Sequence, residues 1–531
     1  MDEKNCTNQK IKAKIIFSRF KTYFNVGAIK RFIFKNLIFF PILFASVDSI
    51  SSTSDLYAGT SKIEISERNA GIFNDPAYVK AIVLQRGKTL VVIVTLDVVA
   101  LAEIGGISND FMLRLRARAK NELGLSADNL IVTASHSHSI IRGDVIDLTM
   151  RAIKIARTKS IPVKVGLGAT KEYRISENRR LLLDNGGELD VRHAYSLPSD
   201  ISTVATGKID PAIGVLRIDD LNSRPVAVLY NFAAHPILGV PSGGNTADYP
   251  GFASKVIEET LGGNVVAFFL QGAAGDVNPR RYKDINQARD AEPMGERLAI
   301  DVIKAWKNIV TKRKGQLSIT KEVIQLPLDQ DIDNRIEKNI ARQTQLLNSI
   351  VGSSLNFRSF IELYMQKAIS PEYPSAHKYR YLQEKSLGQS DLSNLDSEKK
   401  QNIGAYLTNI YIMEEITQLK TNLDLLKKHK LKVAEFNSKY ISVELFGIRI
   451  DNMKLVTFPG EISVEIGIDM KSRNGDDTYI VGYTNGYIYY TPTPEQKKNI
   501  GFAQEDCESI VAPEWRAVFD QASDSIVNRL K

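Results

Sequence analysis

Cysteine is nearly absent from this chain, which has 531 residues and only two cysteines, Cys6 and Cys507. Cys6 lies in a basic N-terminal segment that differs in composition from everything after it. The folded body therefore holds Cys507 alone, which excludes an internal disulfide and leaves the hydrophobic core to stabilise the fold. This cysteine content neither supports nor excludes an exported protein.

The folded body also lacks an excess of charge. The chain has a formal net charge of +8, but residues 1–36 contain nine Lys and Arg against two acidic residues. Removing that segment leaves 60 basic and 59 acidic residues. Nucleic-acid binding requires a basic face on the folded domain itself. We therefore predict that nucleic acid is not a partner.

Long hydrophobic runs are absent except for one short run near the N-terminus. Residues 37–47 are apolar or small, and eleven residues are too few to span a bilayer comfortably. The run suits the hydrophobic region of a signal peptide, and small residues follow it where cleavage could fall. We predict that residues 1–52 are a leader that exports the protein as a periplasmic, secreted or membrane-anchored form. An uncleaved anchor remains open, and association with a membrane surface is compatible with either form.

The rest of the chain alternates apolar strands with amphipathic helices, which predicts a layered α/β architecture. Strands are expected at 81–85, 89–97, 129–132, 163–168, 213–218, 226–231, 264–270, 441–450, 453–458 and 479–483. Helices are expected at 108–124, 144–159, 251–261, 291–309, 462–471 and 514–530. We predict a catalytic domain in two parts, 53–328 and 431–531.

Between these two parts, residues 329–430 are charged, rich in Gln, Leu and Asn, and helical in period. We predict a helical insertion, and we favour a solvated appendage over a catalytic role for it. His377 and His429 lie in this segment without a motif, so both are interpreted as surface residues. His193 lies in a loop-like stretch and is interpreted as incidental.

Five clusters of small and polar residues follow predicted strands, at 135–139, 231–236, 271–280, 458–461 and 485–492. The first carries His136 and His138, whose spacing would place both rings on one side of a strand. A pair of solvated or core histidines is the alternative for this cluster alone. Together with His235 and Glu461, however, the clusters offer imidazole nitrogen and carboxylate oxygen, a donor set that suits zinc.

The clusters resemble the motifs of the neutral, non-lysosomal ceramidase family. The resemblance rests on the His-x-His-Ser run, a later strand-end histidine, Gln-x-x-Ala-Gly-Asp-Val-x-Pro, Pro-Gly-Glu and a tyrosine-rich segment. It covers residues 57–531 apart from the helical insertion, and it includes 178–180 and 247–251. It implies an α/β/β/α-type catalytic domain with mixed sheets, without the family's C-terminal immunoglobulin-like domain.

The resemblance also implies a zinc ion and the residues that hold it. The implied ligands are His136, His235, Glu461 and Tyr490, with His138 as the acid/base beside the metal. Tyr487 and Tyr489 are close enough in sequence to be the phenol ligand in place of Tyr490. The cluster at 271–280 is expected to contact substrate through Gly275, Asp276 and Arg280.

One position departs from the family pattern. Ceramidases of this family carry a catalytic serine where this chain has Asn278, and an amide can serve neither as nucleophile nor as proton shuttle. Asn278 could instead donate a hydrogen bond to an oxyanion. We therefore expect a zinc-dependent hydrolase of linear N-acyl amides such as ceramide or a related lipid. The alternatives are a metal-dependent esterase or phosphoesterase, and a catalytically inactive envelope protein that binds lipid or glycan.

Overall fold

The computed structural model describes residues 55–184, 186–191, 203–280, 286–370, 379–499 and 504–530. The predicted leader, His193 and His377 lie outside these ranges. Among the helices within them, none is both long and apolar enough to cross a bilayer. The strands and helices predicted from the sequence are present, with ends shifted by a few residues.

The largest element is a mixed sheet of nine strands, in the order β12-β11-β10-β5-β1-β2-β3-β4 with β14 beside β5. Neighbours pair antiparallel except β3 with β4 and β11 with β12, which are parallel. Its two edge strands, β12 and β4, are buried along their whole length, in keeping with their continuous apolar sequences. The strands are β1 (Leu56–Glu64), β2 (Tyr78–Arg86), β3 (Thr89–Leu96), β4 (Leu130–Ala134), β5 (Ile161–Lys171), β10 (Ala212–Asp220), β11 (Pro225–Phe232), β12 (Val266–Gln271) and β14 (Lys312–Arg313).

A second sheet of four strands packs on the first. Its order is β15 (Leu317–Pro327), β16 (Tyr440–Ile450), β17 (Met453–Thr457) and β19 (Thr478–Val481). One hydrophobic cluster joins the two sheets, with Phe268 from the large sheet and Phe446 from the small one. The sheets approach so closely that a Cβ on Gly214 would lie 2.4 Å from the ring of Tyr479.

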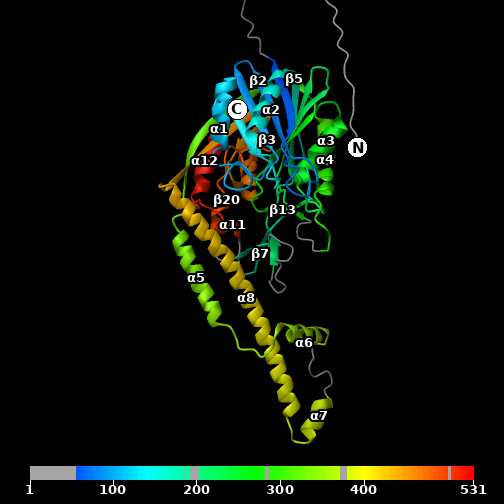
Figure 1. Ribbon diagram of the computed structural model, residues 1–531, viewed down its shortest axis with the longest axis vertical. Coiled ribbons are helices and arrows are strands. Elements are labelled where there is room, and N and C mark those ends of the chain that lie inside the picture. Colours follow the sequence, from blue (N-terminus) through cyan, green and yellow to red (C-terminus); the bar gives the residue numbers. More distant parts are fainter. Residues whose placement is uncertain are drawn as a thin grey trace, which may run out of the picture. The chain divides into compact units, whose positions relative to one another are not determined.

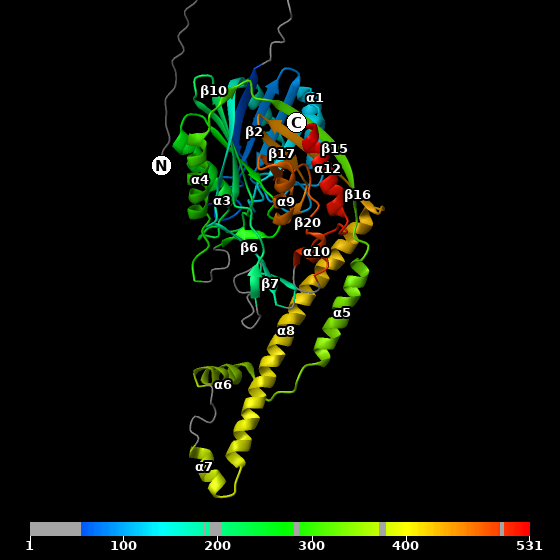
Figure 2. The same ribbon diagram turned by 180° about the vertical axis from the view of Figure 1, so that it is seen from behind.

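Helices cover the outer face of each sheet (Figures 1 and 2). The large sheet is contacted by α2 (Val145–Thr158), α3 (Asp248–Leu261) and α4 (Glu292–Asn308). The small sheet is contacted by α9 (Val464–Asn474) and α12 (Trp515–Arg529). Helix α1 (Phe111–Leu123) packs beside α2 and ends at Gly124, whose φ of 62° forms the predicted glycine cap. The predicted α/β/β/α layering is therefore confirmed.

The large sheet curves until its two edge strands, β4 and β12, contact each other. The segment after β19 joins them. Gly482 N–H donates to the Gln271 carbonyl at 2.9 Å, and the Ala134 N–H donates to the Tyr483 carbonyl at 3.1 Å. Strand ends that are far apart in sheet order are thus brought to one place.

In sequence, four helices separate β15 from β16, although the two strands pair directly in the sheet. They are α5 (Ile332–Asn348), α6 (Phe357–Ile369), α7 (Tyr379–Ser386) and the 45-residue α8 (Asp391–Glu435). Short elements complete the described part: β6 (Ser176–Asn178), β7 (Arg180–Leu183), β8 (Glu188–Asp190), β9 (Thr203–Thr206), β13 (Val277–Pro279), β18 (Glu461–Ile462), β20 (Tyr490–Thr491), α10 (Pro494–Lys497), α11 (Gln504–Cys507) and the 3-10 turn Ala127–Asn129.

The prediction that His429 is a surface residue is wrong. His429 lies in the last turns of α8 and is 0 % exposed. Its part of α8 packs against α11, and Leu423 and Leu426 on neighbouring turns are also buried. Most turns of this long helix are solvated, so its sequence as a whole lacks a clear apolar face. The short buried part that contains His429 was therefore not recognised.

Candidate metal centre

The His-Ser-His run begins where strand β4 ends. The buried strand stops at Ala134, and His136 has a φ of 68°, so the two histidines do not share a strand face as the sequence pattern predicted. Their rings nevertheless lie 5.5 Å apart between centroids. His136 is buried whereas His138 is exposed, so the two rings occupy different environments.

Three serine hydroxyls alternate with these histidines and form a hydrogen-bonded chain. Ser135 and Ser137 hydroxyls are 3.0 Å apart, and those of Ser137 and Ser139 are 3.2 Å apart. Ser139 closes the chain by donating to the Thr246 carbonyl at 2.8 Å. Because a carbonyl only accepts, the chain has one direction, and it holds the strand end in a single conformation.

His136, His235 and Glu461 converge in the interior, although they come from three distant segments. His235 follows β11, and Glu461 begins β18 after the Pro459-Gly460 turn that follows β17. Glu461 Oε2 is 2.9 Å from His235 Nε2 and 3.7 Å from His136 Nε2. All three side chains are buried, and one donor atom from each lies within 4.8 Å of the others.

Backbone carbonyls hold both imidazoles in the same orientation. His136 Nδ1 lies 2.7 Å from the Val99 carbonyl, and His235 Nδ1 lies 3.1 Å from the Val277 carbonyl. Because these oxygens only accept, each Nδ1 carries a proton and each Nε2 faces Glu461. This is the arrangement found for histidines that bind a metal through Nε2.

Burial and mutual attraction set the charges in this group. Burial lowers the pKa of His136 to about 3, so its ring is neutral near pH 7. Burial alone would raise the pKa of Glu461, but the two imidazoles and the Tyr487 hydroxyl hold that pKa well below its usual range. A neutral imidazole beside an ionised carboxylate is the protonation state in which both can ligate a metal.

The segment 483–490 carries four tyrosines, and three of them contact the converging residues. Tyr483 stacks on His136 with ring centroids 4.1 Å apart, and the Tyr487 hydroxyl donates to Glu461. Tyr490 lies nearly parallel to His235 at 6.4 Å between centroids. The Tyr489 hydroxyl instead donates to Glu103, at 2.8 Å, away from the three residues. The predicted phenol ligand is therefore to be sought among Tyr490, Tyr487 and Tyr483.

Asn278 follows Val277, whose carbonyl holds the His235 ring, and is 0 % exposed. Its Oδ1 accepts from Arg179 at 3.1 Å, while its Nδ2 has no hydrogen-bond partner among the described residues. Arg179 also donates to the Gly275 carbonyl at 2.6 Å and lies over the Tyr490 ring. Arg179 thereby fixes which way the amide points and leaves its N–H₂ group available as a donor.

Gly275 and Asp276 contribute through their position in the turn after β12. Gly275 N–H donates to the Ile462 carbonyl at 2.7 Å, and a Cβ there would lie 2.8 Å from the Glu461 carbonyl oxygen. Both Asp276 oxygens are buried and accept from the chain, Oδ1 from the first N–H of α9 at 2.8 Å. Contact of either residue with a substrate stays a prediction, and the arrangement of Asp276 favours a positioning role.

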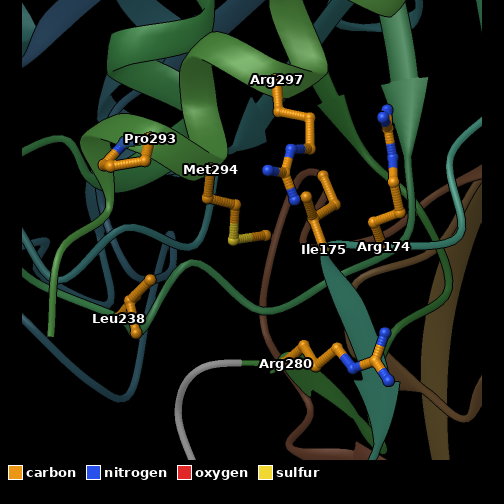
Figure 3. Close-up of a pocket in the computed structure, with 7 residues that line it drawn as sticks. All are labelled: Arg174, Ile175, Leu238, Arg280, Pro293, Met294 and Arg297. Carbon is orange, nitrogen blue, oxygen red and sulfur yellow. The ribbon is translucent and has the colours of Figure 1, made fainter. Parts of the chain in front are cut away.

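Arg280 lies apart from the three converging residues. It lines a small cavity with Arg174, Ile175, Leu238, Pro293, Met294 and Arg297. Figure 3 shows its guanidinium extending away from Leu238 and Met294, while Arg297 points down between Met294 and Ile175. His136, His235 and Glu461 do not line this cavity. A substrate contact of Arg280 therefore also stays a prediction.

Comparison with solved structures identifies two ceramidases that share this fold. A structure described as neutral ceramidase from Pseudomonas aeruginosa matches with a TM-score of 0.56 and 16 % sequence identity, covering 90 % of this chain and 74 % of that chain. A structure described as ceramidase complexed with C2 matches with a TM-score of 0.55 and 14 % identity, covering 90 % and 75 %. No family model matches the sequence, and no curated protein matches it.

Two residues of the centre received no individual role from the sequence. Tyr483 was visible only as a member of a tyrosine-rich segment, and Arg179 only as part of an Asn-Arg-Arg segment. Tyr487 had been named only as an alternative to Tyr490. Two adjacent arginines in an apolar context could have signalled a buried ion-pair network. In the structure Arg179 and Arg180 are both buried with Glu505 and Asp506.

Proposed function

We propose that this protein is a zinc-dependent hydrolase of N-acyl amide bonds that acts on ceramide or a related N-acyl lipid. The observation that carries the proposal is the convergence of His136 Nε2, His235 Nε2 and Glu461 in the interior, with both Nδ1 atoms tied to backbone carbonyls. The shared fold with two ceramidase structures supports the same class of substrate. Export stays a prediction that rests on residues 1–52.

The residues present fit zinc. Two imidazole nitrogens and one carboxylate oxygen are a ligand set typical of catalytic zinc, which keeps a further position open. When bound, zinc would polarise the amide carbonyl and lower the pKa of water. His136, His235 and Glu461 would hold the ion, and we propose Tyr490 as the fourth ligand because its ring runs along His235.

We propose His138 as the group that moves the proton. Its ring is exposed and lies next to the buried His136 ring, so it can reach both the reacting atoms and solvent. In amide hydrolysis the base takes a proton from the attacking water, and the same group then gives it to the leaving amine nitrogen. Without that second transfer an amine is a poor leaving group.

We propose that Asn278 stabilises the negative charge that develops on the amide oxygen. Its Nδ2 is buried and has no partner in the described part of the chain, whereas Arg179 occupies its Oδ1. A free donor of this kind is costly unless something binds to it. Removing a donor that acts on an oxyanion lowers kcat roughly 100-fold with little change in KM.

The test uses the full chain, stripped of metal with a chelator and then loaded with zinc. Fluorescent ceramide and simpler N-acyl amides are assayed beside carboxylic and phosphate esters. We expect amide hydrolysis that requires zinc, is abolished in His136→Ala, and falls in Asn278→Ala but not in the exposed control Asn222→Ala. Hydrolysis of esters without hydrolysis of amides would show that the protein is an esterase and not an amidohydrolase. The absence of both bound metal and turnover, with lipid binding retained, would overturn it.

A further inference from the structure

His429 on helix α8 occupies a place that an apolar residue would fill at lower cost. It is 0 % exposed, and both ring nitrogens lack hydrogen-bond partners among the described residues. A buried polar group without partners is destabilising. Its ring instead stands edge-on to the ring of Tyr489, with centroids 4.5 Å apart and planes at 79°. An edge-to-face pair of rings is a weak contact with a specific geometry.

Lys432, on the same face of α8, is linked through Glu103 to the hydroxyl of Tyr489. Lys432 is three residues after His429, so the two side chains lie side by side on the helix. Lys432 Nζ is 2.9 Å from Glu103 Oε1, and Glu103 Oε2 accepts from the Tyr489 hydroxyl at 2.8 Å. Helix α8 therefore holds both the ring and the hydroxyl of Tyr489.

Tyr489 needs such support because its backbone is strained. Its φ is 65°, and Glu103 has the same φ of 65°. Bulky residues seldom adopt the left-handed region, and they stay there only when surrounding contacts enforce it. On the side of the ring, the contact with α8 is joined by the ring of Tyr487, and these contacts hold the conformation.

Tyr489 in turn holds Glu461. Its carbonyl accepts the Glu461 N–H at 3.0 Å, so the main chain of the two residues is joined directly. The ring of Tyr487, whose hydroxyl donates to the Glu461 carboxylate, stands at 5.3 Å from the ring of Tyr489. The backbone and the side chain of Glu461 thus both depend on the segment that α8 holds.

We infer that helix α8 is a positioning element for Glu461, acting through His429 and Lys432 on Tyr489. The C-terminal end of α8, which contains His429 and Lys432, then supports the candidate site. The helical insertion is therefore not a solvated appendage along its whole length. The role of Glu461 as a metal ligand rests on the proposed function. The mechanical link from α8 to the Glu461 backbone does not, and it is testable by itself.

The experiment compares His429→Ala, His429→Phe and the control Leu419→Ala in the full chain. Leu419 is also buried in α8 but packs with Leu346 of α5. The first measurement needs no metal: amide hydrogen exchange in the peptide that contains Glu461. We expect faster exchange in His429→Ala, near wild-type exchange in His429→Phe, which restores the aromatic contact, and no change there in Leu419→Ala.

The second measurement is zinc affinity by chelator competition. We expect His429→Ala to lower it about tenfold, the size of loss typical when support for a ligand is removed. Equal exchange at Glu461 in His429→Ala and Leu419→Ala would overturn the inference. Failure of the wild-type protein to bind zinc, with the exchange difference present, would instead overturn the proposed function and leave the link between α8 and Glu461 established.

Discussion

Replacing His429 with phenylalanine should change how the stability of the protein depends on pH. Burial lowers the pKa of His429 to about 3, with Lys428 and Lys497 adding to the effect, whereas the residue titrates near 6.5 when unfolded. Below pH 6.5 the unfolded chain therefore binds a proton that the folded chain does not. The free energy of unfolding must then fall as the pH is lowered.

The magnitude follows from this difference in proton binding. Between pH 7 and pH 5 the wild-type protein should lose about 2 kcal/mol of stability through His429 alone, with a limiting slope of about 1.4 kcal/mol per pH unit. His429→Phe keeps an aromatic ring against Tyr489 but binds no proton. Its free energy of unfolding should therefore fall by about 2 kcal/mol less over the same interval.

The assay is denaturant unfolding of metal-free protein at pH 7, 6 and 5, read as the difference between variant and wild type. Metal-free protein is required because proton competition at His136 and His235 would add a pH dependence of its own. Leu419→Ala serves as control: it should lower stability by a similar amount at every pH, since it removes packing but no titrating group. Parallel pH profiles for wild type and His429→Phe would refute the reasoning.

Three further predictions concern the centre itself. Gly275→Ala places a methyl group 2.8 Å from the Glu461 carbonyl oxygen, so zinc affinity by chelator competition should fall, whereas Gly404→Ala, where the space is open, should leave it unchanged. Arg179→Met should lower the free energy of unfolding by roughly 3–5 kcal/mol, because the buried carboxylates of Glu505 and Asp190 lose a partner. A loss below about 1 kcal/mol would contradict this. Tyr490→Phe should lower zinc affinity at least tenfold if its phenol is the fourth ligand, and an unchanged affinity would remove it from the ligand set.

The three residues that converge in the candidate centre could be singled out from the sequence because each one follows a predicted strand. Buried strands such as 130–134 are continuous apolar runs, and His136, His235 and Glu461 come within four residues of a strand end. The layered fold was predictable for the same reason, since strand and helix periods alternate along most of the chain. These signals are local, so they survive in the sequence.

Contacts between distant segments had no such signal. The site exists because the large sheet curves until β4 meets β12, and because the segment after β19 joins both edges. The free Nδ2 of Asn278 depends on Arg179, which is 99 residues away in sequence. The burial of His429 depends on how a 45-residue helix packs at one end only.

The sequence by itself thus determined which side chains are candidate metal ligands and which elements present them, because strand and helix periods and turn residues act over a few positions. The tertiary structure alone decided that His136 is buried while His138 is exposed, that Tyr489 turns away from the three converging residues, and that α8 touches the segment holding Glu461. These outcomes depend on sheet curvature and on side-chain packing between segments that are far apart in sequence, which short-range patterns do not encode.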